Sequence, residues 1–375
     1  MANALQMQGK IRITALQLAF LNITTIISTS DVFLPAFVAQ EAKQDSWISV
    51  LIGTVTSLIV TNIILALGLK HSKKTIIQYS CDILGKPLGK LVGLSYVLFY
   101  LYLCYSVTGE LGEIFVISFN PGSPIAVYSI FTIIVAAYAV TKGLEVIARI
   151  NYLLLPFGIA ILGLVAMLNI PKMHMENFLP ILYEGIYPSI KGSFLIQSWL
   201  FEVLLIFQLI PFVKDKDKIK KYINVSVIFL GISLMFGVLT IAVLGSLTER
   251  YMFPALQYVR YASVGHYIQN LDISIMVLWV SGIFIKIAIT YYCTLLSITQ
   301  FFGLESYKNL ILPVGLLIIA SSLNSTKTIT DMVHSLHYIF PFHMFLMGFI
   351  IPFILLLVSV IKDKIKAAVS ANQQS

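Results

Sequence analysis

The stretch Ile26-Ile-Ser-Thr-Ser-Asp-Val-Phe-Leu-Pro35 lies inside an apolar run over residues 11–38. At about 1.5 Å per residue, this run is long enough to cross a bilayer as a helix. The three hydroxyl residues and the carboxylate at positions 28–31 compete for nearby backbone groups, and Pro35 removes a backbone donor. We therefore expect a membrane helix that is broken into two halves at residues 28–31.

A break at residues 28–31 would indicate a functional site, but the stretch also allows an unbroken helix. A broken helix at membrane depth occurs where it is buried in protein or lines a cavity, and it commonly holds a small ligand between its half-helix ends. The alternative is a continuous helix that is kinked at Pro35, with its serines bonded back to their own helix.

The composition is that of an integral membrane protein. Of the 375 residues, 58% are hydrophobic and 11% are charged, and the mean hydropathy is +0.90, whereas soluble domains carry about 25% charged residues. The net charge of +8 comes from basic residues dispersed among short loops, so we expect no nucleic-acid partner. The polar N-terminus, residues 1–10, does not have the pattern of a signal peptide.

The hydropathy pattern predicts an all-α fold with ten transmembrane helices. They are expected at residues 11–38, 47–68, 88–118, 125–140, 144–168, 187–213, 223–247, 273–302, 310–323 and 336–361. A short interfacial helix is expected at residues 75–84. With the N-terminus inside, eighteen of the 25 lysines and arginines, Lys10 among them, fall in inner segments. Six, including Lys327, fall in outer segments, so both termini are predicted to be cytoplasmic.

The sixth span resembles the first in being interrupted. Gln197, Ser198 and Glu202 fall in the middle of the bilayer, and Pro211 lies near the inner end. A pair of interrupted helices in corresponding positions of two halves indicates a transporter binding site.

Spans one and six begin two halves of five spans each. The halves cover about residues 11–168 and 187–361, and the loop charges place their entry points on opposite sides of the membrane. We therefore expect one membrane domain over residues 1–375, built as an inverted 5+5 repeat with broken helices 1 and 6.

Four charged residues lie well inside the predicted spans, namely Asp31, Glu110, Glu202 and Lys286, and Glu113 lies close to the outer end of its span. An uncompensated charge at the centre of a membrane helix costs about 2.5–3.5 kcal/mol on insertion scales, so these groups should face a cavity or be paired. Glu202–Lys286 is the first expected pair and Glu110–Lys286 the second. A purely structural ion pair remains the alternative to a functional one.

The side chains expected to bind a ligand are the polar ones at the two interruptions, together with one buried glutamate. They are Ser28, Thr29, Ser30, Asp31, Glu110, Gln197, Ser198 and Glu202. His334, His337 and His343 near the outer end of the last span have only Asp331 close in sequence, so we expect no metal. No cofactor motif or nucleophile–base pattern occurs in the spans, so no cofactor and no enzyme activity are expected.

Several motifs together resemble the spore germination protein family, the B subunits of nutrient germinant receptors, within the amino acid–polyamine–organocation superfamily. The motifs are Asp-Val-Phe-Leu-Pro35, Thr141-Lys-Gly-Leu-Glu-Val-Ile-Ala-Arg149, Asn177-Phe-Leu-Pro180, Phe201-Glu202, Asn270-Leu-Asp-Ile-Ser-Ile-Met-Val-Leu-Trp279 and Phe284-Ile-Lys286. Family members commonly carry glycines in the first-span break, where this sequence has residues 28–31, so the nutrient cannot be carried over from a relative.

The resemblance implies a LeuT-like fold in the spore inner membrane and assembly with an A-type membrane subunit and a C-type lipoprotein subunit. It also implies sensing of a small nutrient such as an amino acid. The alternative function is an amino acid permease coupled to protons or sodium. In sodium-coupled relatives of this fold, a sodium ion lies between spans one and eight, and here span eight carries Lys286. We therefore expect the ammonium of Lys286 to replace that ion, bracing span eight against span one or Glu202.

Overall fold

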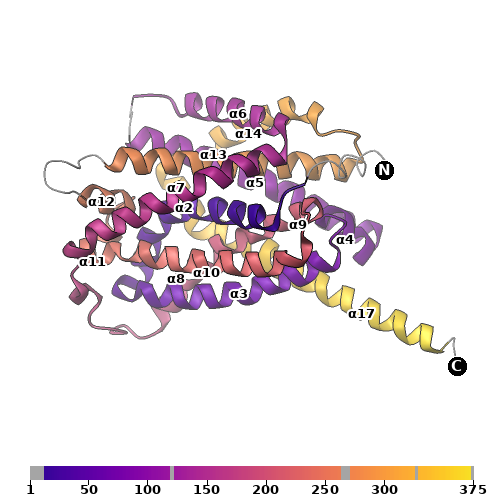
Figure 1. The fold of residues 1–375 in the computed structure, drawn as a ribbon, viewed down its shortest axis with the longest axis horizontal. Coiled ribbons are helices and arrows are strands. Elements are labelled where there is room, and N and C mark those ends of the chain that lie inside the picture. The colour runs from indigo at the N-terminus through magenta and orange to yellow at the C-terminus, as the bar shows by residue number, and fades with distance from the viewer. Residues whose placement is uncertain (1–11, 119–121, 263–270, 326–327, 373–375) are drawn as a thin grey trace.

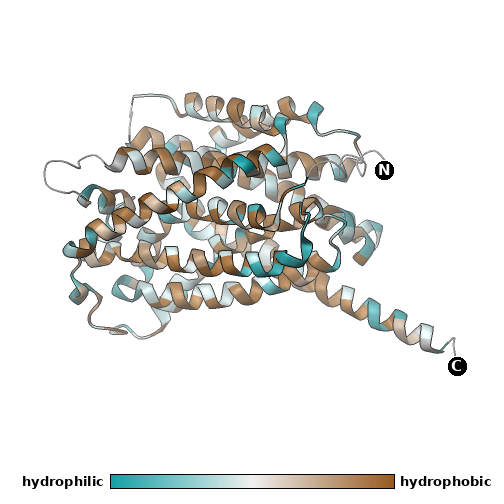
Figure 2. Cartoon of the chain, in the orientation of Figure 1, coloured by the Kyte–Doolittle hydropathy of each residue, from teal (hydrophilic) through white to brown (hydrophobic). Residues whose placement is uncertain are grey.

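The computed structural model describes residues 12–118, 122–262, 271–325 and 328–372, and over these residues every regular element is a helix. The helices form an elongated bundle (Figure 1). Apolar residues dominate along its length, and hydrophilic residues concentrate toward its two ends (Figure 2). The predicted polar N-terminus at 1–10, Asn270 and Lys327 lie outside the described residues.

Nine helical stretches of the described chain are long and apolar enough to cross a membrane. The first, Ala15–Lys70, contains two helices, α2 (Ala15–Ala42) and α3 (Ser46–Lys70), joined by a 3-10 turn. The predicted all-helical membrane class is therefore confirmed, and the count of ten spans stays a prediction.

The remaining α-helices follow the predicted spans and connecting segments. Their bounds are α4 (Ile76–Leu84), α5 (Lys86–Ser118), α6 (Ile125–Lys142), α7 (Leu144–Asn169), α8 (Tyr187–Leu200), α9 (Ile206–Leu209), α10 (Ile219–Val238), α11 (Thr240–Leu244), α12 (Pro254–Tyr261), α13 (Leu271–Phe302), α14 (Ile311–Ser325), α15 (Ile329–His334), α16 (Phe340–Phe345) and α17 (Ile351–Asn372). The short helix expected at residues 75–84 is present as α4, which begins after a capping box between Thr75 and Gln78.

The first span differs from the prediction, because α2 is one uninterrupted α-helix of 28 residues. The hydroxyls of Thr25 and Ser28 donate to the backbone carbonyls of Asn22 and Thr25 in the same helix, at 3.0 and 3.5 Å. Such back-bonding satisfies the hydroxyls without opening the helix. Pro35 lies inside α2 and removes only its own backbone donor. The predicted break at residues 28–31 was therefore wrong, and the continuous-helix alternative holds.

The sixth span does change its backbone in the predicted region. The α-helix α8 ends at Leu200, and a 3-10 helix covers Phe201–Leu205 before α9 begins. The span thus changes helix type at Glu202 rather than separating into two halves. It is also the most enclosed of the nine stretches, with 94% of its apolar window buried inside the described bundle.

Backbone contacts join the beginning of the first span to the end of the sixth. Ile13 and Val213 form a parallel bridge, with Ile13 N donating to Phe212 O at 3.0 Å. Two residues later, the backbone N–H of Ala15 donates to a carboxylate oxygen of Asp215 at 2.8 Å. These bonds close the bundle at the end of α2 that carries the N-terminus.

Candidate functional site

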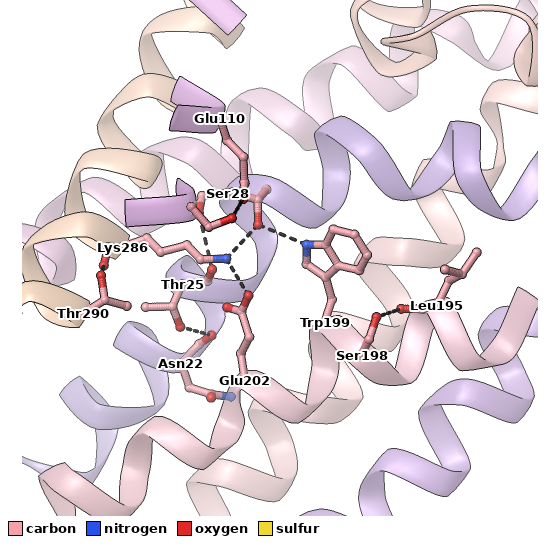
Figure 3. Close-up of polar contacts among 12 residues, drawn as sticks. Asn22, Thr25, Ser28, Glu110, Leu195, Ser198, Trp199, Glu202, Lys286 and Thr290 are labelled. Atoms are coloured by element: carbon pink, nitrogen blue, oxygen red, sulfur yellow. Dashed lines mark hydrogen bonds and ion pairs between the residues drawn. The ribbon is translucent and has the colours of Figure 1, made fainter. Parts of the chain in front are cut away.

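A buried ion pair lies at the centre of the bundle. Lys286 on α13 donates from Nζ to Glu202 Oε1 at 2.7 Å and to Thr29 Oγ1 at 2.8 Å (Figure 3). Both charged side chains are 1% exposed. This is the first of the two pairings expected from the sequence, and it joins the eighth span to both the sixth and the first.

The hydroxyl of Thr29 is shared by two donors. Its oxygen accepts from Lys286 and also from the indole Nε1 of Trp199 on α8, at 3.1 Å. A single α2 side chain therefore links α8 and α13. Trp199 and Glu202 are three residues apart, and near a 3-10 segment this spacing places both side chains on the same side of the span.

The other expected partner of Lys286 is held differently. Glu110 on α5 is buried and accepts a hydrogen bond from Ser106, one helical turn earlier, at 3.1 Å. In the described part of the chain, the ion pair of Lys286 is with Glu202, so the Glu110–Lys286 pairing is not formed. Glu110 nevertheless faces the same space as Lys286.

One carboxylate oxygen of the site accepts no hydrogen bond from the described residues. Glu202 Oε2 is buried and has no hydrogen-bond partner among the described residues, whereas Oε1 accepts from Lys286. Leaving a buried acceptor unpaired is unfavourable. The site therefore has capacity for one further donor beside an existing cation.

The charged groups surround a closed space whose walls come from five regions of the chain. It is lined by Thr29, Leu103, Ser106, Val107, Glu110, Trp199, Glu202, Lys286, Leu336 and Phe340. As described, these side chains leave no room for a water molecule between them. Any ligand that enters must displace one of the wall residues, and Leu336 and Phe340 of the last span form the apolar part of that wall.

The structure brings together only part of the predicted ligand set. Thr29, Glu110 and Glu202 meet around Lys286, whereas five other predicted residues do not line this space. Ser28 and Asp31 face cavities on the other side of α2. Ser30 is buried elsewhere, Gln197 donates to Ser193 at 3.5 Å, and Ser198 donates to the carbonyl of Leu195 at 2.6 Å.

Six lining residues were missed by the sequence analysis, namely Leu103, Ser106, Val107, Trp199, Leu336 and Phe340. Ser106 precedes the buried Glu110 by four residues, and this spacing on a helix could have indicated the contact. Trp199 lies three residues before Glu202, which is a comparable signal. The four apolar residues carry no such signal, because apolar residues in a membrane span face lipid as often as protein.

The family model described as "Spore germination protein" matches residues 12–330 of this chain. Among curated proteins, spore germination protein KB of Bacillus subtilis (strain 168) is 27% identical over 367 residues, covering 95% of this chain and 96% of that protein. Spore germination protein B2 of the same strain is 24% identical and covers 94% and 97%. Spore germination protein XB of Bacillus anthracis is 26% identical and covers 74% and 78%.

Two solved structures show the fold. MhsT in complex with L-phenylalanine has a TM-score of 0.67 at 12% identity, covering 94% of this chain and 99% of that one. Mhp1, a nucleobase-cation-symport-1 family transporter with bromovinylhydantoin bound, has a TM-score of 0.59 at 12% identity, covering 93% and 92%. By its sequence match and its LeuT-like architecture, this chain belongs to the spore germination protein family.

Proposed function

We propose that this chain is the membrane subunit of a spore nutrient germinant receptor and that it binds an amino acid in the closed space around Lys286. The observation that supports this is the meeting of both charge signs there: one ammonium, from Lys286, with two carboxylates, from Glu110 and Glu202. An amino acid carries one group of each sign, so it can exchange partners with this set. MhsT, which has the same fold, is known in complex with L-phenylalanine.

The mechanism follows from how the site is held closed. Lys286 joins α13 to α2 and the sixth span through two hydrogen bonds. A ligand carboxylate would compete with Glu202 for the lysine, and a ligand ammonium would bind Glu110 or the free oxygen of Glu202. Binding would thereby loosen the Lys286 contacts and let α13 shift relative to α2. That shift is the signal we assign to the receptor.

We place the receptor in the spore inner membrane with both termini cytoplasmic, and in a complex with an A-type membrane subunit and a C-type lipoprotein. The excess of basic residues in the predicted inner segments supports the orientation. Membership of the germination family supports the partners and the compartment.

The second candidate is an amino acid permease, which the fold shared with transporters favours. The two functions differ in whether solute crosses the membrane. Uptake of labelled amino acids into vesicles containing the full chain, under sodium and proton gradients, separates them. Gradient-driven accumulation would replace the receptor assignment with a permease.

The receptor assignment is tested in spores that carry Glu110→Gln. We expect the nutrient concentration for half-maximal germination to rise at least tenfold, with the protein level unchanged. Glu113→Gln is the matched control, because Glu113 is a buried glutamate of the same helix that does not line the closed space. An equal response in the two variants would contradict the assignment.

A further inference from the structure

A second cavity lies against α2 on the side away from Lys286. It has a volume of about 160 Å³ and adjoins a smaller one of about 60 Å³. Ile27, Asp31 and Trp279 line both cavities. Thr24, Ile27 and Asp31 are spaced three and four residues apart, so they lie on one face of α2. Thr29 lies on the opposite face.

Asp31 is the charged group of this cavity. Its side chain is 8% exposed, and its Oδ1 has no hydrogen-bond partner among the described residues. Three further buried polar atoms on the larger cavity, Thr240 Oγ1, Tyr258 OH and Trp279 Nε1, are likewise without partners there. Buried polar groups are ordinarily hydrogen-bonded, so several orphans on one cavity indicate a missing occupant.

Apart from Ser233, the rest of the wall is apolar, and it reaches the outer surface of the bundle. The cavity lies between α7 and α10, both of which contact α2. At its edge Gly163 on α7 and Ile232 and Phe236 on α10 are exposed. These two helices are among the apolar stretches that are long enough to span the membrane, so this edge faces the hydrocarbon layer.

We propose that this cavity is a binding site for a membrane-soluble organic amine, with its ammonium on Asp31 and a benzene-sized apolar body in the larger chamber. A carboxylate selects a cationic head, and among the described residues no lysine or arginine lines either cavity to supply that charge from the chain. The rings of Trp279 and Tyr258 also favour a cation. The volume matches the roughly 150 Å³ apolar cavity known to hold benzene.

This site is independent of the proposed nutrient site and stands or falls without it. The two are nevertheless connected through one helix, because Asp31 and Thr29 are two residues apart on α2 and face opposite sides. An occupant of the cavity therefore contacts the helix that receives the Lys286 hydrogen bond.

Gly163 lines the larger cavity, and its Cβ position makes no contact that a larger side chain would disturb. A Cβ built at this position has no atom within 4 Å, so a larger side chain would extend into open space. Gly163→Phe is the blocking variant, and Leu164→Phe is its control, because Leu164 is the next residue, is 44% exposed and does not line the cavity.

The test uses the full chain in phosphatidylcholine nanodiscs and three probes of one size: benzylamine, benzyl alcohol and benzoate. Binding is measured by saturation-transfer NMR and calorimetry against empty nanodiscs. We expect benzylamine to bind at least tenfold more tightly than benzyl alcohol, and benzoate not to bind. Asp31→Asn should remove that tenfold preference, and Gly163→Phe should abolish binding of both benzylamine and benzyl alcohol, whereas Leu164→Phe should retain it.

The opposite results would overturn the proposal. Equal binding of amine and alcohol in the wild type would make the cavity a general apolar or lipid-filled space. If Asp31→Asn kept the preference for benzylamine over benzyl alcohol, the amine would bind elsewhere. Benzylamine binding that persists in Gly163→Phe would lead to the same conclusion. Elution of all three variants as the same monodisperse species as the wild type shows that the fold is retained.

Discussion

Lys286 Nζ and Glu202 Oε1 lie 2.7 Å apart, joined across 84 residues of sequence and buried to the same extent. The pair forms where a 3-10 segment in the sixth span faces the middle of α13. Burial makes the two charges mutually dependent, because removing one leaves the other uncompensated in a low-dielectric interior.

The first prediction concerns this dependence. Lys286→Met should destabilise the protein by about 3–5 kcal/mol, because it leaves the Glu202 carboxylate buried without its cation. The double variant Lys286→Met, Glu202→Gln should recover most of that loss, since both charges are gone. Thermal unfolding of the purified chain measures the difference. A single variant as stable as the wild type would show that the pair contributes no net coupling.

The same variants separate stability from response in spores. We expect the double variant to accumulate in the spore membrane like the wild type yet fail to respond to nutrient, because the ligand carboxylate would have lost its cation. A normal response in the double variant would make Lys286 a structural residue only.

The second prediction is that the response needs no sodium. Lys286 contacts Thr29 of the first span directly, so its ammonium already supplies the positive charge between α2 and α13. Replacing all sodium by choline should leave the dose–response of wild-type spores unchanged. A requirement for sodium would contradict the view that the ammonium takes the place of the ion.

The third prediction concerns the hydroxyl shared at Thr29. Thr29→Val keeps the shape but removes the acceptor used by Lys286 and Trp199, which should cost about 1–3 kcal/mol and weaken the nutrient response. Thr29→Ser keeps the acceptor and should stay within about 1 kcal/mol of the wild type, since it loses one buried methyl group. Unfolding midpoints and germination dose–response curves for the two variants give the comparison.

The fourth prediction concerns partners. Spores that lack only the neighbouring A-type subunit should fail to respond to the nutrient, and this chain should become scarce in them, because we assign the signal to a complex. Immunoblots of spore membranes together with germination assays measure both effects. A strain without that subunit that responds normally would eliminate the partner assignment.

Local composition was enough to determine the class of this protein, and it also predicts the depth of its charges in the membrane. Long apolar runs predict membrane helices because insertion depends on hydropathy summed over about 20 residues, and a lysine about fourteen residues into such a run must lie near mid-bilayer. The short helix α4 was also predictable, since its cap and its apolar spacing are local features. For the same reason, the expectation that Lys286 would need a carboxylate partner required no structure.

Only tertiary packing decided which carboxylate pairs with Lys286. Glu110 and Glu202 were both expected inside the membrane as partners of Lys286, and the choice depends on how α5, α13 and the sixth span are rotated against one another. Residues 28–31 show the same limit, because a hydroxyl can bond equally well to its own helix or to a neighbour, and so the sequence allowed both a broken and a continuous α2. Because α2 is continuous, its helical periodicity places Thr29 on the face toward Lys286 and Asp31 on the opposite face of the helix. The polar residues predicted to form one site are therefore divided between two spaces, because side chains two residues apart on a helix point about 200° apart.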